Sequence, residues 1–395
     1  MQRIYVVGTG DTKAAELDYI AGLILAQGGV VVRVDLSTRP SAMVCDVTPE
    51  QVAAHHPGGE SAVLGLTDRG VAVAAMAEAF ARYLLTRDDI GGVIGIGGGG
   101  GTSIIAAGLR GLPYGMPKLL VSTMAAGNTA PYIGISDLIL MPAVTDLAGL
   151  NSLSRVVLHN AAMAIVGMVQ HPAPVVRSKP AIGLTMFGVT TDCVTALTAA
   201  LQDSHDCMVF HATGTGGAVM EKLMDSGLII GLLDITTTEV ADHLCGGTLA
   251  CGPDRFGAAA RTGIPQVVSL GALDMVNFGA PDTVPADLRN RLFHHHNPAV
   301  TLMRTTPVEN ARIGAWVAAR LNLCNGPTHL LIPEGGISAL DAPGQPFHDP
   351  AANAALFDTL QSTLIQTPDR RLSRLPHHIN DPAFAAAAAA AFHAL

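Results

Sequence analysis

The 395-residue sequence has few charged and few aromatic side chains. Asp, Glu, Lys and Arg make up 14% of the residues and Phe, Trp and Tyr 4%, whereas hydrophobic residues reach 49%. Charged residues are about 25% of an average soluble domain. The high apolar content excludes intrinsic disorder, which requires low hydrophobicity and high charge. The 43 glycines have no period of three and no heptad pattern persists, which excludes collagen and a coiled coil.

Long aliphatic runs are also missing, although the mean hydropathy is +0.38. The two longest uncharged stretches are Ile90–Leu109, which carries nine glycines, and Leu119–Ser136. A membrane span requires about 20 predominantly apolar residues. We therefore predict no membrane partner. The N-terminal apolar run of four residues does not match a signal peptide, so we expect a cytoplasmic protein.

Basic residues are scarce as well. Lys and Arg number 23 against 32 Asp and Glu, which gives a net charge of −9. Proteins that bind nucleic acids use positive charge to neutralise phosphates, so we predict no nucleic-acid partner. The six cysteines form no Cys-x-x-Cys pair, and we expect reduced thiols packed as small hydrophobic side chains.

Aliphatic segments alternate with glycine turns and helical segments along the chain. Ile4–Val7 is predicted to be a strand, followed by a glycine turn and the helix Ala14–Gln27. The same plan recurs at 93–109, where a glycine loop separates strand from helix, and again after residue 180. Residues 171–180 contain three prolines and interrupt this alternation of strands, turns and helices. We predict an α/β protein of two Rossmann-like domains with mainly parallel sheets, residues 1–178 and 179–395.

The clearest candidate binding site is the run of five glycines after the predicted strand 93–96. A turn requires one or two glycines, so five favour a backbone that lies directly against a ligand. Backbone N–H groups at a helix N-terminus bind anions such as phosphate. The residues expected to bind in this way are Gly97, Gly98, Gly99, Gly100, Gly101 and Thr102.

A second glycine turn follows the first predicted strand. Its lysine could reach a phosphate, its threonines supply hydroxyls and its aspartate could hold a metal ion. The alternative is that the turn only starts a helix, with the aspartate at or near the N-cap. These residues are Thr9, Gly10, Asp11, Thr12 and Lys13. After the strand predicted at 118–122, small and polar residues are expected to close the site, namely Gly127, Asn128 and Thr129.

The second half repeats the glycine-turn pattern. Its turn is expected to face the ligand through Gly214, Gly216 and Gly217. Glu239 has capping-box spacing, so it is either a structural cap or a proton-transfer group. His296 ends a run of three histidines, which form either a solvated loop or, with Arg304, an anion or metal site. Glu239 and His296 are the candidate catalytic residues, and no metal ligand set is assigned.

Asp35 offers an alternative, because it ends the predicted strand Val30–Asp35. Dinucleotide-binding folds place a ribose-binding acid at this position, which favours an NAD-type oxidoreductase. However, Lys13 replaces the third glycine of the dinucleotide motif. The formal match at Gly95–Gly100 lacks a charged partner after the next strand.

Together these motifs resemble the tomato mosaic virus resistance protein family, the Tm-one-like ATP-binding proteins. The resemblance spans essentially the whole chain in order, at segments 8–13, 97–102, 122–129, 211–217, 296–306 and 333–347. It implies two α/β domains, ATP near the first domain's glycine loops and a homodimer. The family often has Ser-Gly-Asp-Thr where this chain has Ala126–Thr129, so a carboxylate is missing there.

The resulting hypothesis is a protein that binds ATP, with or without Mg²⁺, or a related phosphate-bearing metabolite, in the cleft between two domains. Whether it catalyses a reaction is left open. The alternatives are a non-catalytic, nucleotide-dependent dimer that acts as a sensor and an NAD-type oxidoreductase.

Overall fold

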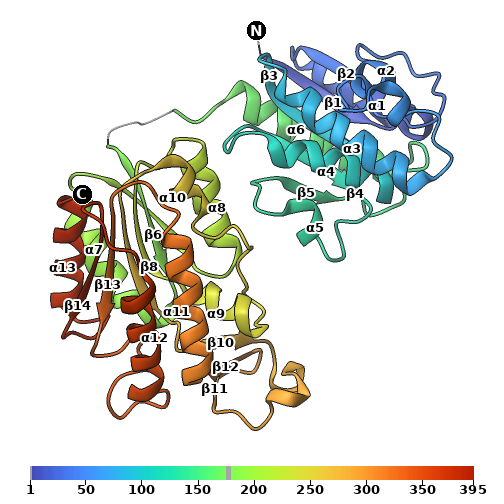
Figure 1. Ribbon diagram of the computed structural model, residues 1–395. Coiled ribbons are helices and arrows are strands. Elements are labelled where there is room, and N and C mark those ends of the chain that lie inside the picture. The colour runs from blue at the N-terminus through green and yellow to red at the C-terminus, as the bar shows by residue number, and fades with distance from the viewer. Residues whose placement is uncertain (1, 175–178) are drawn as a thin grey trace. The chain divides into compact units, whose positions relative to one another are not determined.

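The computed structural model describes residues 2–174 and 179–395 (Figure 1). The chain divides into two compact units, residues 1–175 and 176–395. The predicted domain boundary after residue 178 lies outside the described residues. Each unit has its own large parallel sheet with helices on both faces, so the predicted α/β fold of two Rossmann-like domains is confirmed.

The first unit contains a five-stranded parallel sheet in the order β2-β1-β3-β4-β5. β3 is buried along its whole length, as expected for a continuous apolar strand between two helical layers. The strands are β1 (Arg3–Gly8), β2 (Val31–Asp35), β3 (Ile90–Gly97), β4 (Lys118–Ser122) and β5 (Ile139–Pro142).

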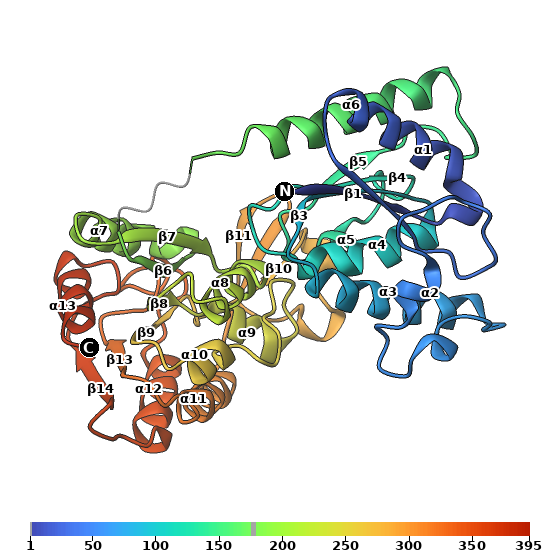
Figure 2. The same ribbon diagram turned by 90° about the horizontal axis from the view of Figure 1, so that it is seen from above.

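Helices cover both faces of this sheet, as Figure 2 shows. One layer consists of α1 (Gly10–Ala26) and α6 (Ser152–Gln170), and the other of α3 (Arg69–Leu85) and α4 (Gly99–Gly111). Three short helices lie in the connections, α2 (Pro49–Ala53), η1 (Glu60–Ala62) and α5 (Ala130–Ile133).

α6 is long and apolar enough to cross a membrane, judged by length and composition alone. In this structure one of its faces is buried in the unit. Its residues Leu158 and Ile165 share a hydrophobic cluster with Leu17 and Ile20 of α1. The apolar sequence of α6 is therefore accounted for by core packing.

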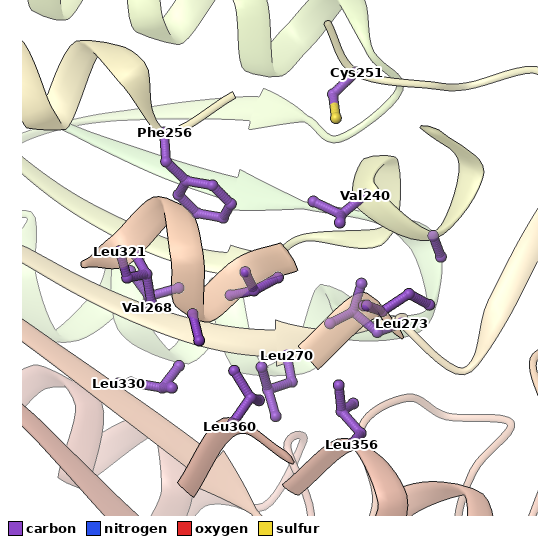
Figure 3. Packing of buried hydrophobic residues seen from close by; sticks show 14 of the residues in the cluster. Val240, Cys251, Phe256, Val268, Leu270, Leu273, Leu321, Leu330, Leu356 and Leu360 are labelled. Atoms are coloured by element: carbon purple, nitrogen blue, oxygen red, sulfur yellow. The ribbon is translucent and has the colours of Figure 1, made fainter. Parts of the chain in front are cut away.

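The second unit contains a six-stranded parallel sheet in the order β14-β13-β9-β8-β6-β7. Its strands are β6 (Ala181–Met186), β7 (Asp206–His211), β8 (Gly231–Thr236), β9 (Gln266–Gly271), β13 (Thr328–Pro333) and β14 (Arg370–Leu375). In Figure 3, Val268 and Leu270 of β9 lie near Leu321, Leu356 and Leu360, which belong to the same hydrophobic cluster.

Helices also cover both faces of this second sheet. α7 (Thr191–Leu201) and α13 (Pro382–His393) contribute to the cluster on one face. The other face carries α8 (Thr215–Asp225), α9 (Thr238–Cys245), α10 (Gly257–Thr262), α11 (Pro307–Leu321) and α12 (Pro350–Thr363).

A three-stranded antiparallel sheet completes the second unit and has no counterpart in the sequence prediction. Its order is β10-β12-β11, with β10 (Met275–Phe278), β11 (Phe293–Asn297) and β12 (Val300–Arg304). The run of three histidines lies in β11, so the prediction of a loop there is wrong. Short 3-10 helices occur at Gly188–Thr190, Pro281–Thr283 and Ala286–Leu288.

Candidate functional site

The two glycine motifs of the first unit lie at the same edge of its sheet. β1 and β3 are neighbours, and β2 lies beyond β1 whereas β4 lies beyond β3. The strand order therefore runs in opposite directions from β1 and from β3. In open parallel sheets, ligands bind outside the carboxyl ends of the strands at the point where the strand order reverses. Segments 9–13 and 98–102 directly follow β1 and β3, so the fold brings both to this position.

A cavity of about 150 Å³ lies between these segments. Two exposed cationic side chains, Arg39 and Arg69, contribute to it, from the loop after β2 and from the start of α3. Neither arginine was predicted, because neither belongs to a glycine motif and only tertiary structure brings them here. The predicted residues that line the cavity are Thr9, Asp11, Thr12, Gly100 and Gly101.

A larger cavity of about 620 Å³ shares Thr38 and Arg39 with the first. Apolar side chains form part of its wall, including Met43, Leu64 and Leu66. The two cavities together therefore combine a polar, cationic end with a partly apolar end.

The glycine run is not the predicted loop. β3 ends at Gly97, Gly98 is the N-cap of α4, and three glycines form the first helical residues. Gly97 must be glycine, because a Cβ there would lie 2.5 Å from the backbone nitrogen of Thr102. The helix therefore begins within the glycine run, and not after it as predicted.

Neither packing nor backbone conformation explains Gly99, Gly100 and Gly101. A Cβ on Gly99 would meet nothing within 4 Å, and one on Gly100 would lie 3.4 Å from Val73, an ordinary contact. None of the three has a φ in the left-handed region. Glycine inside a helix costs about 0.5–1 kcal/mol relative to alanine. The fold alone would favour alanine here, and the missing side chains leave the first turn of α4 open to the cavity.

The amides of the other motif already have partners. The Gly10 N–H donates to Asp35 Oδ1 at 2.8 Å, and the Asp11 N–H donates to Ser37 Oγ at 2.9 Å. Asp35 is 1% exposed and stabilises the N-terminus of α1, which begins at Gly10 instead of the predicted Ala14. The Thr9 and Thr12 hydroxyls lie 3.0 Å from each other and Asp11 Oδ1 accepts from Ser37 Oγ at 3.3 Å. Asp11 and Thr12 are exposed, so the side chains of this motif, and not these N–H groups, are the groups that a ligand can reach.

The remaining predicted residues of this unit lie outside the smaller cavity's lining. Lys13 has non-helical φ and ψ, and its Nζ lies 3.5 Å from the Thr12 carbonyl oxygen. Thr102 is buried, and its Oγ1 lies 2.6 Å from Ser122 Oγ, which ties α4 to β4. Gly127, Asn128 and Thr129 precede α5, and the first two are exposed.

In the second unit the glycine turn binds one of the protein's own carboxylates. The N–H groups of Gly214 and Gly217 donate to Glu239 Oε1 at 2.8 and 3.1 Å. Gly214 is the N-cap of α8, so Glu239 supplies the acceptor that this residue lacks. Glu239 does not cap its own helix, because the N-cap of α9 is Thr237 and has no side-chain cap bond. The predicted capping box is therefore wrong, although the carboxylate does cap a different helix.

Packing explains why this turn contains glycines, whereas it does not explain the glycines of α4. A Cβ on Gly216 would overlap the carbonyl oxygen of His211, and one on Gly217 would overlap the Glu239 carboxylate. Close approach of backbone and carboxylate therefore accounts for both residues.

Arg255 gathers three buried carboxylates around its guanidinium. It lies 2.9 Å from Glu239, 2.8 Å from Asp234 and 3.2 Å from Glu221. Burial raises the pKa of Glu221, while Arg255 opposes the shift. Both oxygens of Glu239 are engaged in this network, which is internal to the unit.

His296 is exposed in β11, and Arg304 does not join it in an anion site as the sequence suggested. Arg304 is buried and donates to the Phe347 carbonyl oxygen at 2.7 Å and to Asn353 Oδ1 at 2.9 Å. Within residues 2–174 and 179–395, no group of three or more His, Cys, Asp or Glu side chains is arranged to hold a metal ion.

Comparisons with known proteins cover both units. The N-terminal domain profile of the uncharacterised protein family UPF0261 matches residues 2–174, and its C-terminal domain profile matches 179–395. A UPF0261 protein of Rhizobium meliloti (strain 1021) is 61% identical over 99% of this chain and 98% of its own length. A UPF0261 protein of Clostridium tetani (strain Massachusetts / E88) is 41% identical over 98% of this chain and 97% of its own length.

A plant protein is also similar. The ToMV resistance protein Tm-1(GCR237) of Solanum lycopersicum is 42% identical over 97% of this chain, which corresponds to 54% of the tomato protein. Among solved structures, a glycosyltransferase, SnogD from Streptomyces nogalater, aligns over 99% of this chain and 98% of its own. At 11% identity and a TM-score of 0.17, this alignment carries no argument about fold or function.

Proposed function

The chain belongs to the UPF0261 family, and from this premise we propose that its N-terminal unit binds the phosphate groups of ATP, or of a related phosphate-bearing metabolite. The similarity to the tomato protein confirms the resemblance drawn from the motifs. The name of that relative describes resistance to a virus, which is not transferred to this chain. The proposal of a ligand rests on the geometry of the first unit.

The first turn of α4 is the observation that carries the proposal. Its three glycines are required neither by packing nor by φ, and two of them line the cavity between the segments that follow β1 and β3. The N-terminus of a helix offers N–H groups and a positive dipole end to an anion. A phosphate bound there would gain contacts that any side chain at these positions would obstruct.

Charged and hydroxyl groups around the cavity support the same ligand. Arg39 and Arg69 supply guanidinium groups suited to phosphate oxygens, and Thr9 and Thr12 supply hydroxyls. Asp11 adds one carboxylate, which fits Mg²⁺ because that ion commonly binds one or two carboxylates together with phosphates and water. The adjoining 620 Å³ cavity offers room for the nucleoside.

The second unit is not needed for this proposal. Gly214 and Gly217 already donate to Glu239, so an incoming phosphate would have to compete with an internal carboxylate for these amides. A ligand position between the domains stays a prediction, as do catalytic roles for Glu239 and His296, a homodimer and a cytoplasmic location.

A ligand panel tests the proposal directly. The full chain is heated with ATP and Mg²⁺, ADP, inorganic triphosphate, NAD or NADP, and its Tm is recorded. A ligand at 100 times its Kd stabilises the folded state by about 2.7 kcal/mol, so ATP should raise Tm clearly. No shift with ATP or triphosphate at millimolar concentration would overturn the proposal, and a shift with NAD alone would favour the dinucleotide alternative. Phosphate release from ATP then distinguishes an enzyme from a sensor.

A further inference from the structure

The second unit contains a cavity of about 440 Å³ beside its antiparallel sheet. It has no lining residue in common with the cavities proposed for nucleotide. Arg289, His295 and Thr301 contribute polar groups, and Val284 and Phe293 contribute apolar surface. This combination of a few convergent polar groups with an apolar wall is typical of small-molecule sites.

Thr301 is the unusual residue of this cavity. It is 1% exposed in the central strand β12, and its Oγ1 is buried without a hydrogen-bond partner in the described part of the chain. A buried hydroxyl without a partner destabilises a protein, and valine would fill the same volume without that cost. Nothing in the fold accounts for this hydroxyl, and Thr301 is one of the residues that line the cavity.

The hairpin directs two further side chains to the same cavity. His295 lies directly opposite Thr301 in the β11–β12 pairing, so the two side chains share one face of the sheet. Phe293, two residues before His295 on the same strand, lies on this face as well. Arg289, from the segment before β11, adds an exposed guanidinium.

We propose that this cavity binds a small organic anion, a carboxylate or a phosphate monoester attached to an apolar group. Arg289 forms paired hydrogen bonds to the anionic oxygens. His295 donates a ring N–H, and Thr301 donates the hydroxyl that lacks a partner. Val284 and Phe293 cover the apolar part of the ligand, and Asp282, which also lines the cavity, accepts from a ligand hydroxyl or ammonium group.

Calorimetric titration of the full chain with phenyl phosphate and with benzoate tests this site, and uncharged benzyl alcohol is the matched control. We expect at least one anion to saturate the protein and benzyl alcohol not to. Arg289→Ala should weaken that binding about tenfold or more. Arg371→Ala, which removes the same charge from β14, should leave the binding unchanged. No saturable binding of either anion up to about 10 mM, or equal losses in the two variants, would overturn the proposal.

Thr301→Val separates a binding role from a structural one. The variant should weaken anion binding about fivefold, because one neutral hydrogen bond is lost. It should also raise the Tm of the ligand-free protein, because the hydroxyl without a partner is gone. Unchanged anion affinity would contradict the assignment of Thr301, whatever the Tm does. ATP binding to the first unit should be the same in all three variants, so failure here leaves the nucleotide proposal standing.

Discussion

At the scale of single residues, two similar glycine turns have different roles. Gly216 and Gly217 approach a backbone carbonyl and the Glu239 carboxylate so closely that no side chain fits. Gly99 and Gly100 meet no such obstacle. The sequence could predict that both turns start helices and offer N–H groups. It could not predict that Glu239, more than 20 residues away in the chain, would occupy one of them, because that contact depends on tertiary packing.

Replacing Gly100 by alanine should separate stability from binding. Alanine in the first turn of α4 should raise the free energy of unfolding by about 0.5–1 kcal/mol, because it restricts the unfolded chain. Its methyl group should also project into the space proposed for phosphate and raise the Kd for ATP about tenfold, which calorimetry measures. Gly111→Ala, at the other end of the same helix and with nothing within 4 Å of its Cβ, is the control. Equal ATP affinities of the two variants would count against the site.

Glu239→Gln should destabilise the second unit. The substitution removes a buried negative charge from beside Arg255. If the Gln carbonyl oxygen accepts from the two backbone N–H groups, the Gln NH2 group faces the Arg255 guanidinium, donor against donor. Arg255 keeps its other two carboxylates as partners, so we expect a cost of about 1–3 kcal/mol, which urea unfolding would detect. Glu334→Gln, in a partly exposed pair with Arg374, should cost less than about 1 kcal/mol. Normal stability of Glu239→Gln together with a loss of turnover would instead support a catalytic role.

Asp274 should make stability depend on pH. Burial and the nearby Asp341 carboxylate raise the pKa of Asp274 from 3.8 to about 7. The positive charge of Arg304 acts in the opposite direction and lowers this pKa. Between these values the folded protein holds a proton that the unfolded chain has released, so the free energy of unfolding falls as the pH rises. Asp274→Asn mimics the protonated acid and should flatten this slope, with a gain of up to about 4 kcal/mol at pH 8. Urea unfolding from pH 4 to 8 measures the slope, and exposed Asp203→Asn should keep it.

At the scale of helices and strands, the sequence predicted the strands that aliphatic runs indicate and the turns that glycines indicate. The predicted strands 4–7, 30–35, 93–96 and 118–122 are present in the structure within a few residues. The antiparallel sheet escaped prediction, because β11 consists mainly of histidines and has little aliphatic character. α3 was not predicted either, although Asp68 before an alanine-rich segment is a helix start signal. The place of Arg69 beside the glycines of α4 depends on tertiary packing.

At the scale of the whole molecule, the question is how much of the ligand site one unit contains. The first unit has its own sheet, its own helical layers and both cavities proposed for the nucleotide. A chain of residues 1–174 should therefore fold by itself and bind ATP within about threefold of the full chain's Kd, since no contact from the second unit is required. Circular dichroism would verify folding, and calorimetry would compare the affinities. A folded fragment that binds ATP more than about tenfold more weakly would show that residues beyond 174 contribute, as the cleft hypothesis predicts.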